Sequence, residues 1–479
     1  MGFMIRKIAK KEFIEMCRDE RFRFVGGFVL VLLITTMLAG WSHYRSVTAE
    51  REAARNFDEQ QWLMQPPRNP HSAAHFGKYA FKPITPISFL DNGVNSYLGI
   101  AVWLEAHYQN PFRYRPVEDS TVVQRFGELT AAVVLQLLLP LVIILLTFST
   151  FAGERESGTL RQLLSVGVAP HNLFFGKALG VAAALLFLIV PATIIGVIAL
   201  ALLTTGTSAD GLSNSAGRFA FMMVSYLLYL FAFLAIGLAV SAYFRKSQIA
   251  LLVLFAFWIF NCLLLPRVAA DTAQKVYPTM SSIEFWERIT TDMNQGIDGH
   301  NPRGKRLEEA KQALLAKYGV ARVEDLPINF VGWSLQQSEE YGNRVFDLRY
   351  GELWETIKKQ NQIFQLSSVF APLPAIKSIS MSMAGTDFDH HRHFSIEAEN
   401  YRRMINKILN EDYMNNSRTG DTNYVADSKL WQSIPQFQYQ LPDATWAIRT
   451  QILPFTILIL WAFGALCLAV FAVKKVRPE

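Results

Sequence analysis

The chain has 479 residues, of which 51% are hydrophobic and 18% are charged, and its mean hydropathy is +0.18. This balance excludes an ordinary soluble protein and favours a membrane protein with a large polar portion. The net charge is +6, but the basic residues do not cluster with aromatic residues as they would on a nucleic-acid-binding surface, so no nucleic-acid partner is expected.

Six apolar stretches are long enough to cross a membrane as helices, which takes about 20 residues. An even number of spans places both chain ends on the same side of the membrane. The stretches therefore predict an all-α polytopic membrane protein with six transmembrane helices. The predicted spans are residues 24–41, 129–151, 174–204, 218–243, 248–266 and 450–473.

The segment before the first span, residues 1–23, is basic and carries apolar residues roughly on one helical face. Such a segment is typical of an elbow helix that lies in the membrane interface. A plain cytosolic amphipathic turn is the alternative. The first span is predicted to be an uncleaved anchor, because the basic segment is too long for a signal peptide and Trp41 stands where a lipoprotein signal needs cysteine.

The distribution of Lys and Arg predicts the orientation, since cytoplasmic loops carry an excess of these residues. Basic residues are concentrated before the first span, after the second, at Arg245 and Lys246 between the fourth and fifth, and in the tail at 474–479. All four places lie on one side, which is therefore predicted to be cytoplasmic. A short loop at 205–217 then lies on the opposite side.

Two long polar segments, residues 42–128 and 267–449, are also predicted to lie outside the cytoplasm. Together they make more than half of the chain, and such lengths imply a folded domain rather than loops. The pattern at 305–319 predicts a helix that ends at Gly319, and residues 394–409 predict a helix with one apolar face. We therefore expect a large, mainly α-helical extracytoplasmic domain.

The block between the second and third spans, residues 152–173, contains the stretch GERESGTLRQLL. Gly153 and Gly158 are spaced as in a phosphate-binding loop, but Thr159 stands where that loop needs a lysine, and a membrane span precedes the block in place of a buried strand. The block instead predicts a short amphipathic helix after a serine-glycine break. Such a helix suits docking into a groove of a soluble partner, and an ordinary cytoplasmic connector is the alternative.

At this block the chain resembles the ABC-2 type permeases, the membrane subunits of one class of ATP-binding-cassette transporters. The elbow helix and the six-span count extend the resemblance. The large inserts after the first and fifth spans resemble those of a branch with a big periplasmic insert of unknown function, as do residues 69–83 and 384–402. The family pattern E-x-x-x-G-T-L…LL…P…GK is matched by Glu154, Gly158, Thr159, Leu160, Leu163, Leu164, Pro170, Gly176 and Lys177.

The resemblance implies a type V ABC exporter-like fold in a bacterial inner membrane, with cytoplasmic termini and a periplasmic domain. It implies a subunit that is not an enzyme and holds no cofactor, while ATP and Mg²⁺ bind to separate ABC ATPase subunits. A second permease subunit, identical or paired, completes the pathway, membrane lipid surrounds the spans, and a periplasmic or lipoprotein partner is a further candidate. The residues expected to couple to the ATPase are Glu154, Arg155, Glu156, Ser157, Gly158, Thr159, Leu160, Leu163 and Leu164.

Two histidine-rich stretches, HSAAH at 71–75 and TDFDHHRH at 386–393, lie in the predicted extracytoplasmic segments. If they meet in the fold, their imidazoles and carboxylates suit Zn²⁺ or Cu²⁺. The favoured alternative is hydrogen-bonded histidines that cap helices, with the two aspartates at a helix start. The candidate metal ligands are His71, His75, Asp387, Asp389, His390, His391 and His393.

The sequence thus predicts a permease subunit that couples ATP hydrolysis in a partner to the movement or extraction of a substrate. Two alternatives are a membrane-anchored periplasmic metal-handling module and a non-transporting ABC-linked signalling platform. The chain contains neither a G-x-S-x-G nor an H-E-x-x-H motif. The centres of the six spans lack ionisable residues, which argues against a proton-driven transporter.

Overall fold

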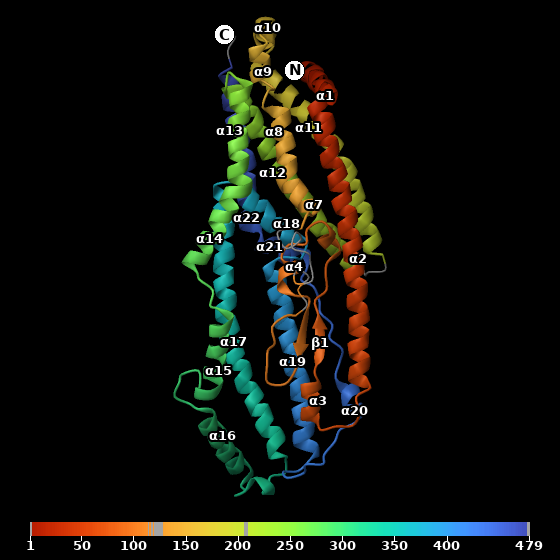
Figure 1. Cartoon of the computed structure of the whole chain (residues 1–479), viewed down its shortest axis with the longest axis vertical. Coiled ribbons are helices and arrows are strands. Elements are labelled where there is room, and N and C mark those ends of the chain that lie inside the picture. The colour runs from red at the N-terminus through yellow and green to blue at the C-terminus, as the bar shows by residue number, and fades with distance from the viewer. Residues whose placement is uncertain (1, 114, 116–117, 119–127, 206–208, 477–479) are drawn as a thin grey trace.

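Six helices of the computed structural model are long and apolar enough to cross a membrane, counted over the residues that the structure describes (Figure 1). This result confirms the predicted all-α polytopic fold. The described residues are 2–113, 115, 118, 128–205 and 209–476, so parts of the predicted segments 42–128, 205–217 and 474–479 lie outside them. The six candidate spans are Phe22–Leu63, Ala131–Glu156, Pro170–Leu203, Gly211–Tyr243, Ser247–Val276 and Ile452–Lys474.

The molecule is elongated, with the six spanning helices gathered at one end (the membrane bundle) and a polar domain at the other (Figure 1). We use "polar domain" for residues 64–113 and 277–443, which pack beside the outer ends of two spanning helices. Both described chain ends lie at the bundle end of the molecule, as expected for an even number of spans (Figure 1).

The first spanning helix is much longer than the apolar stretch that predicted it. Helix α1 (Gly2–Arg18) is followed by the π-helical turn η1 (Phe22–Gly26) and by α2 (Gly27–Leu63). The 37 residues of α2 make a rod of about 55 Å at 1.5 Å per residue. The predicted first span ended at residue 41, so α2 continues beyond it and carries the chain into the polar domain (Figure 1).

The second and fourth spanning helices form the centre of the membrane bundle. Nearly every side chain of α8 is buried, and a Cβ added at Gly237 of α12 would lie 2.1 Å from Thr147 Oγ1. Glycine therefore allows α12 to press directly against α8. The elements from the second to the fourth span are α7 (Ala131–Val133), η3 (Val134–Leu138), α8 (Leu139–Thr147), α9 (Ala152–Glu156), α10 (Thr159–Ser165), α11 (Pro170–Leu203) and α12 (Ala209–Tyr243).

The fifth spanning helix also leaves the bundle without a break, because α14 continues it into the polar domain (Figure 1). Its π-helical turn η4 and the turn η3 carry buried amide side chains that have partners: Gln136 donates to Tyr226 over 2.9 Å, and Asn261 accepts from the backbone N–H of Leu373 over 3.0 Å. The buried amides of these two turns thus have hydrogen-bond partners inside the bundle. The remaining bundle elements are α13 (Ser247–Ile259), η4 (Phe260–Leu264), α14 (Leu265–Val276), α21 (Ala444–Thr450) and α22 (Ile452–Lys474).

The first part of the polar domain contains a small antiparallel sheet, the only one among the described residues. Strand β1 (Lys78–Phe81) pairs with β2 (Ala101–Leu104) so that Lys78 lies opposite Leu104. Three short helices accompany these strands, and of this part β1 and one of the short helices pack directly against α2. These helices are α3 (Pro70–Phe76), η2 (Pro86–Phe89) and α4 (Asn95–Leu98).

The rest of the polar domain is helical, as predicted. Helix α16 ends at Tyr318 and is capped by the predicted Gly319, whose φ of 65° is the left-handed conformation of a helix C-cap. Helix α19 buries Phe394, Ala398 and Ile405 on the face expected from their spacing. The helices are α15 (Ser282–Gln295), α16 (Arg303–Tyr318), η5 (Val323–Asp325), α17 (Phe330–Leu366), η6 (Ser367–Val369), α18 (Leu373–Met383), α19 (Phe388–Asn416) and α20 (Ser428–Ser433).

A buried arginine joins the polar domain to the membrane bundle. Arg218, near the start of α12, donates to the carbonyl oxygens of Ser382 over 3.1 Å and Pro442 over 2.6 Å. Its Nη1 also lies 3.1 Å from Nε2 of His390. Because the guanidinium is almost fully buried and has these partners, the junction is held by directional hydrogen bonds.

Candidate functional site

The block predicted to meet a partner protein projects from the bundle end that carries both chain ends (Figure 1). It consists of α9 and α10, separated by Gly158 in a left-handed conformation with a φ of 78°. The hydroxyls of Ser157 and Thr159 each donate to the carbonyl oxygen of Glu154 over 3.2 Å. The serine-glycine break is therefore a defined turn, and glycine is needed there for its backbone conformation.

Helix α10 turns its leucines toward the bundle. Leu160 is buried, whereas Leu163 and Leu164 are partly buried against the same core. The opposite face, with Arg161, Gln162 and Ser165, is exposed. The leucines thus attach the helix to its own chain, and the polar face is the one open to a partner. A role of the leucines in an ATPase contact stays a prediction.

A cluster of four charged side chains lies beneath this block and joins three elements. Nζ of Lys177, on α11, lies 3.0 Å from Oε2 of Glu12 on α1 and 2.9 Å from Oε1 of Glu154 on α9. The side chain of Lys177 is only 2% exposed. Lys11 approaches the same Glu154 oxygen at 3.4 Å from the solvent side. Burial raises the pKa of the Glu12 carboxyl, although the adjacent charge of Lys177 opposes that rise.

Two glycines of α11 allow α1 to approach closely enough to form this charge cluster. A Cβ added at Gly176 would lie 2.5 Å from Cγ2 of Ile8, and one added at Gly180 would lie 2.6 Å from Cβ of Glu12. Such distances leave no room for a side chain. The glycine-lysine pair of the sequence pattern thus has two roles: the glycine admits α1, and Lys177 pairs with its acidic residue.

Two further charged residues of the block, both on α9, bind the connection between α12 and α13. Arg155 donates to the carbonyl oxygens of Phe244 over 2.7 Å and Ala242 over 3.1 Å. Glu156 accepts hydrogen bonds from the backbone N–H of Ser247 over 2.9 Å and from its hydroxyl over 2.8 Å. These contacts satisfy two backbone carbonyl oxygens at the end of α12 and one backbone N–H at the start of α13. The block is consequently tied to α1, α11, α12 and α13 together.

Sequence reasoning missed Lys11, Glu12 and Ser247 as parts of this site. A signal for Glu12 was present, because it follows Ile8 by one helical turn on the apolar face of a basic segment. An acidic residue in that position needs a buried basic partner, and Lys177 provides it. Ser247 had no comparable signal, since its contact depends on how α9 meets the start of α13.

The candidate metal ligands are divided between two places. His71 and His75, on α3, lie with His107 from the turn after β2, and the nearest ligand atoms of these three are within 4.8 Å of one another. In the described part of the chain, no other group of three or more His, Cys, Asp or Glu side chains meets that condition. Burial lowers the pKa of His71 to about 4, and the charges of His107 and His75 add to this effect.

Asp387, His390 and His393, around the start of α19, have structural partners instead. Asp387 is the N-cap of α19 and accepts from the backbone N–H of His390 over 2.9 Å, while Asp389 lies in the first turn. Nδ1 of His393 lies 3.0 Å from the hydroxyl of Tyr439. Asp387 thus starts the helix, and His390 and His393 have hydrogen-bond partners, as the favoured alternative expected. A metal-binding role of the residues at this helix start stays a prediction.

Two groups near this helix start have strongly shifted acidities. Burial acts to raise the pKa of Asp387, but the charge and hydrogen bonds of His390 outweigh it and hold the value at about 2. Burial lowers the pKa of His391 to about 3, since its ring packs against Phe112 with centroids 4.4 Å apart. His391 is therefore neutral over the ordinary pH range.

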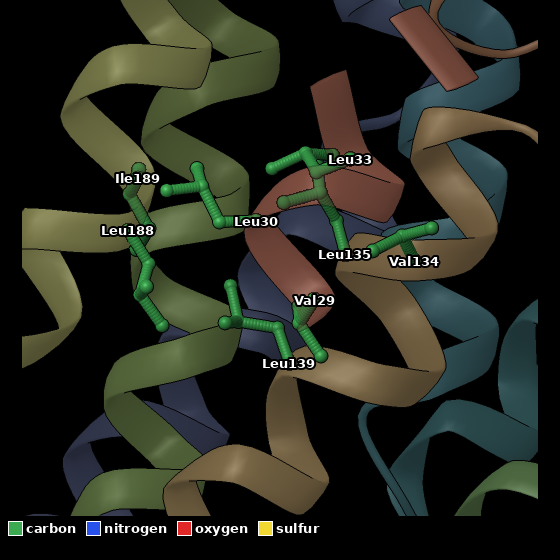
Figure 2. A pocket seen from close by; sticks show the side chains of 8 residues that line it. All are labelled: Val29, Leu30, Leu33, Val134, Leu135, Leu139, Leu188 and Ile189. Carbon is green, nitrogen blue, oxygen red and sulfur yellow. The ribbon is translucent and has the colours of Figure 1, made fainter. Parts of the chain in front are cut away.

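An apolar cavity of about 250 Å³ lies within the membrane bundle, between α2, α11 and α12. Leu33, Met37 and Phe219 are among its lining residues, and Thr193 and Tyr226 are its polar ones. A second apolar gap adjoins it and is filled by side chains, so that no volume is left for a water molecule (Figure 2). The cavity can thus hold an apolar group, whereas the adjoining gap is part of the packed core.

Comparison with known families gives two matches. The model of the family described as ABC-2 family transporter protein matches residues 6–321, which is more than half of the chain. The model of a domain of unknown function, DUF3526, matches residues 282–440. The first match contains the α9–α10 block and the charge cluster, and the second contains most of the helices of the polar domain. No curated protein matches the chain.

Proposed function

The chain belongs to the ABC-2 family of transporter proteins, and from this premise we propose that it couples ATP hydrolysis by a separate ATPase to the movement or extraction of a substrate at a bacterial inner membrane. The chain is the non-catalytic membrane subunit of that assembly. ATP and Mg²⁺ bind to the ATPase subunits, and a second permease subunit, identical or paired, completes the pathway.

The observation that supports this proposal is the attachment of the α9–α10 block. Its charged residues bind α1, α11, α12 and α13 within hydrogen-bond distance. The block projects beyond these helices (Figure 1), and the polar side chains of α10 are exposed. A force on that face is therefore transmitted to several spanning helices at once. This arrangement suits a lever that responds to conformational change in a bound ATPase.

The positive charge at the same end supports the proposed orientation. Lys and Arg residues of α1, of the α9–α10 block and of the α12–α13 turn all lie at the bundle end of the molecule (Figure 1). We assign this end to the cytoplasm, because cytoplasmic loops are enriched in these residues. The polar domain then lies in the periplasm, where it can receive a substrate or a lipoprotein partner.

The experiment that tests the proposal uses the exposed face of α10. The full-length chain is purified from native membranes in a mild detergent, and its companions are identified by mass spectrometry. We expect an ABC ATPase in stoichiometric amount with the unchanged chain and a loss of that ATPase with Arg161→Glu. Arg303→Glu, an identical change at an exposed residue of the polar domain, is the matched control and should retain the ATPase.

Two results would contradict the proposal. One is the absence of any ABC ATPase under several mild detergents. The other is an ATPase that is retained by Arg161→Glu as well as by the control, which would place the contact elsewhere. Membrane insertion of both variants should be normal, because neither side chain is buried.

A further inference from the structure

Three histidines from two separate segments of the polar domain converge on one point. His71 and His75 are four residues apart on α3 and so lie on the same helical face. His107 faces them from the turn after β2, and the three ring centroids are 4.7 to 5.2 Å apart. The ligand nitrogens lie within 4.8 Å of one another, so the three rings have to close in on a common point to reach one ion at Zn–N distances of about 2.0–2.1 Å.

The third histidine is held in place by a buried carboxylate. Nδ1 of His107 lies 2.7 Å from Oε1 of Glu339, and the backbone N–H of His107 donates to the same oxygen over 2.7 Å. This contact assigns the proton to Nδ1 and leaves Nε2 free as a ligand. A carboxylate that accepts from the second nitrogen of a histidine is the usual outer support of a metal ligand, because it orients the ring and raises its basicity.

The carboxylate itself is fixed by a network that is independent of the histidines. The second oxygen of Glu339 lies 3.1 Å from Nη1 of Arg402, whose side chain is 1% exposed. Arg402 also pairs with Glu399 over 2.8 Å. Helices α17 and α19 therefore hold the Glu339 side chain in place without a metal ion. Binding of an ion then needs no further free energy to order this carboxylate.

The backbone of His107 has a strained conformation, and this conformation favours the approach of the three histidines. Its φ is 69°, and among the described residues other than glycine it is the only one in the left-handed region. A non-glycine residue in that region costs free energy, and such outliers occur most often at functional sites. The conformation turns the His107 ring toward α3, where both other imidazoles lie.

We propose that His71, His75 and His107 form a binding site for a divalent transition-metal ion that prefers imidazole, with Zn²⁺ as the reference ion. Three nitrogen ligands favour Zn²⁺, Cu²⁺ or Ni²⁺ over Mg²⁺ and Ca²⁺, which take oxygen ligands. Three protein ligands leave a fourth position for water or another small ligand. His75 is exposed, so an ion can reach the site from solvent.

The site is independent of the proposed coupling to an ATPase, because it lies at the far part of the molecule from α9 and α10 (Figure 1). Metal bound there would draw α3 toward the β2 turn and α17. The polar domain should consequently be more stable with Zn²⁺ than without it, since binding to the folded state alone shifts the unfolding equilibrium.

The test measures zinc binding to the full-length chain, purified in detergent through a tag without histidines and freed of metal with a chelator. Equilibrium dialysis with ZnCl₂ should give one Zn²⁺ per chain and a rise in the thermal unfolding midpoint, and MgCl₂ should give neither. His75→Ala should weaken binding at least about tenfold, since even loss of an outer-shell partner has that effect. His300→Ala, a change at an exposed histidine outside the cluster, is the matched control and should bind as the unchanged chain does.

A second variant separates binding from folding. Glu339→Gln should weaken zinc binding by about 10- to 100-fold, and its metal-free unfolding midpoint shows whether the fold is intact. Spectra of the Cu²⁺ form report imidazole nitrogen ligands directly, and their number should fall by one in His75→Ala. The proposal is overturned if the unchanged chain binds no zinc, or if His75→Ala and His300→Ala bind it equally well.

Discussion

Replacement of Lys177 by methionine is the most direct test of the charge cluster that joins α1, α9 and α11. Methionine retains the apolar stem of the side chain and removes only its charge, so the packing against α1 is preserved. Glu12 and Glu154, whose side chains are 9% and 15% exposed, then lose the ammonium that lies 3.0 and 2.9 Å away.

Breaking a buried ion pair by removing one partner costs about 3–5 kcal/mol, because the other charge stays buried without compensation. Two features place the expected cost of Lys177→Met near the lower limit, at about 3 kcal/mol. The pKa of Glu12 is already raised by burial, so this carboxyl can become protonated, and Lys11 still lies 3.4 Å from Glu154.

The assay is chemical or thermal unfolding of the full-length chain in detergent, with Lys11→Met as the control. Lys11 is 52% exposed, and an exposed pair contributes at most about 1 kcal/mol. The double variant Glu12→Gln with Lys177→Met should recover part of the lost stability, since it removes the unpaired carboxylate. Equal stability of the two single variants would refute the reasoning that the buried cluster holds these elements together.

Three further outcomes are expected from the same structure. Gly180→Val should detach α1, because a Cβ there would lie 2.6 Å from Cβ of Glu12. The measurement is the rate of tryptic cleavage of α1, which should rise. Gly464→Val is the control and should leave that rate unchanged, because a Cβ added at Gly464 meets no atom within 4 Å. Gly158→Ala should cost about 1–2 kcal/mol in thermal unfolding, because alanine is strained at a left-handed φ, and no destabilisation would contradict the turn. His391 has a folded pKa of about 3, below its unfolded value of about 6.5, so the stability it contributes is complete above pH 6.5 and should fall by about 2 kcal/mol at pH 5. His391→Gln should remove that part of the acid sensitivity, and identical pH profiles of unfolding would show that His391 is not responsible.

The six spans were predictable because each depends on a local run of apolar residues, and length alone separates a membrane helix from a core helix. The ends of α2 and of the fifth span were not predictable in the same way. Residues 42–63 and 267–276 are polar, and they continue their helices because the polar domain packs beside them (Figure 1). Hydropathy marks where a helix can leave the membrane and carries no signal for where it ends.

The candidate site was partly predictable. The spacing around Gly158 predicted the turn and the amphipathic helix, because a left-handed glycine and a leucine face are local features. The sequence also marked Glu154 and Glu156 as functional, yet it could not reveal that the first pairs with Lys177 and the second binds Ser247. Those partners lie far along the chain, and only the packing of α1, α11 and α13 brings them together.

By itself, then, the sequence determined the fold class, the number of spans and the position of the α9–α10 block, since all three follow from patterns within a few helical turns. The tertiary structure alone decided which charges are buried together and which histidines meet. His107 shows why: it lies 32 positions after His75 with no shared periodicity, and the β2 turn and the buried Glu339 bring its ring to α3. Contacts between distant segments depend on how whole elements pack, and short sequence patterns do not encode that packing.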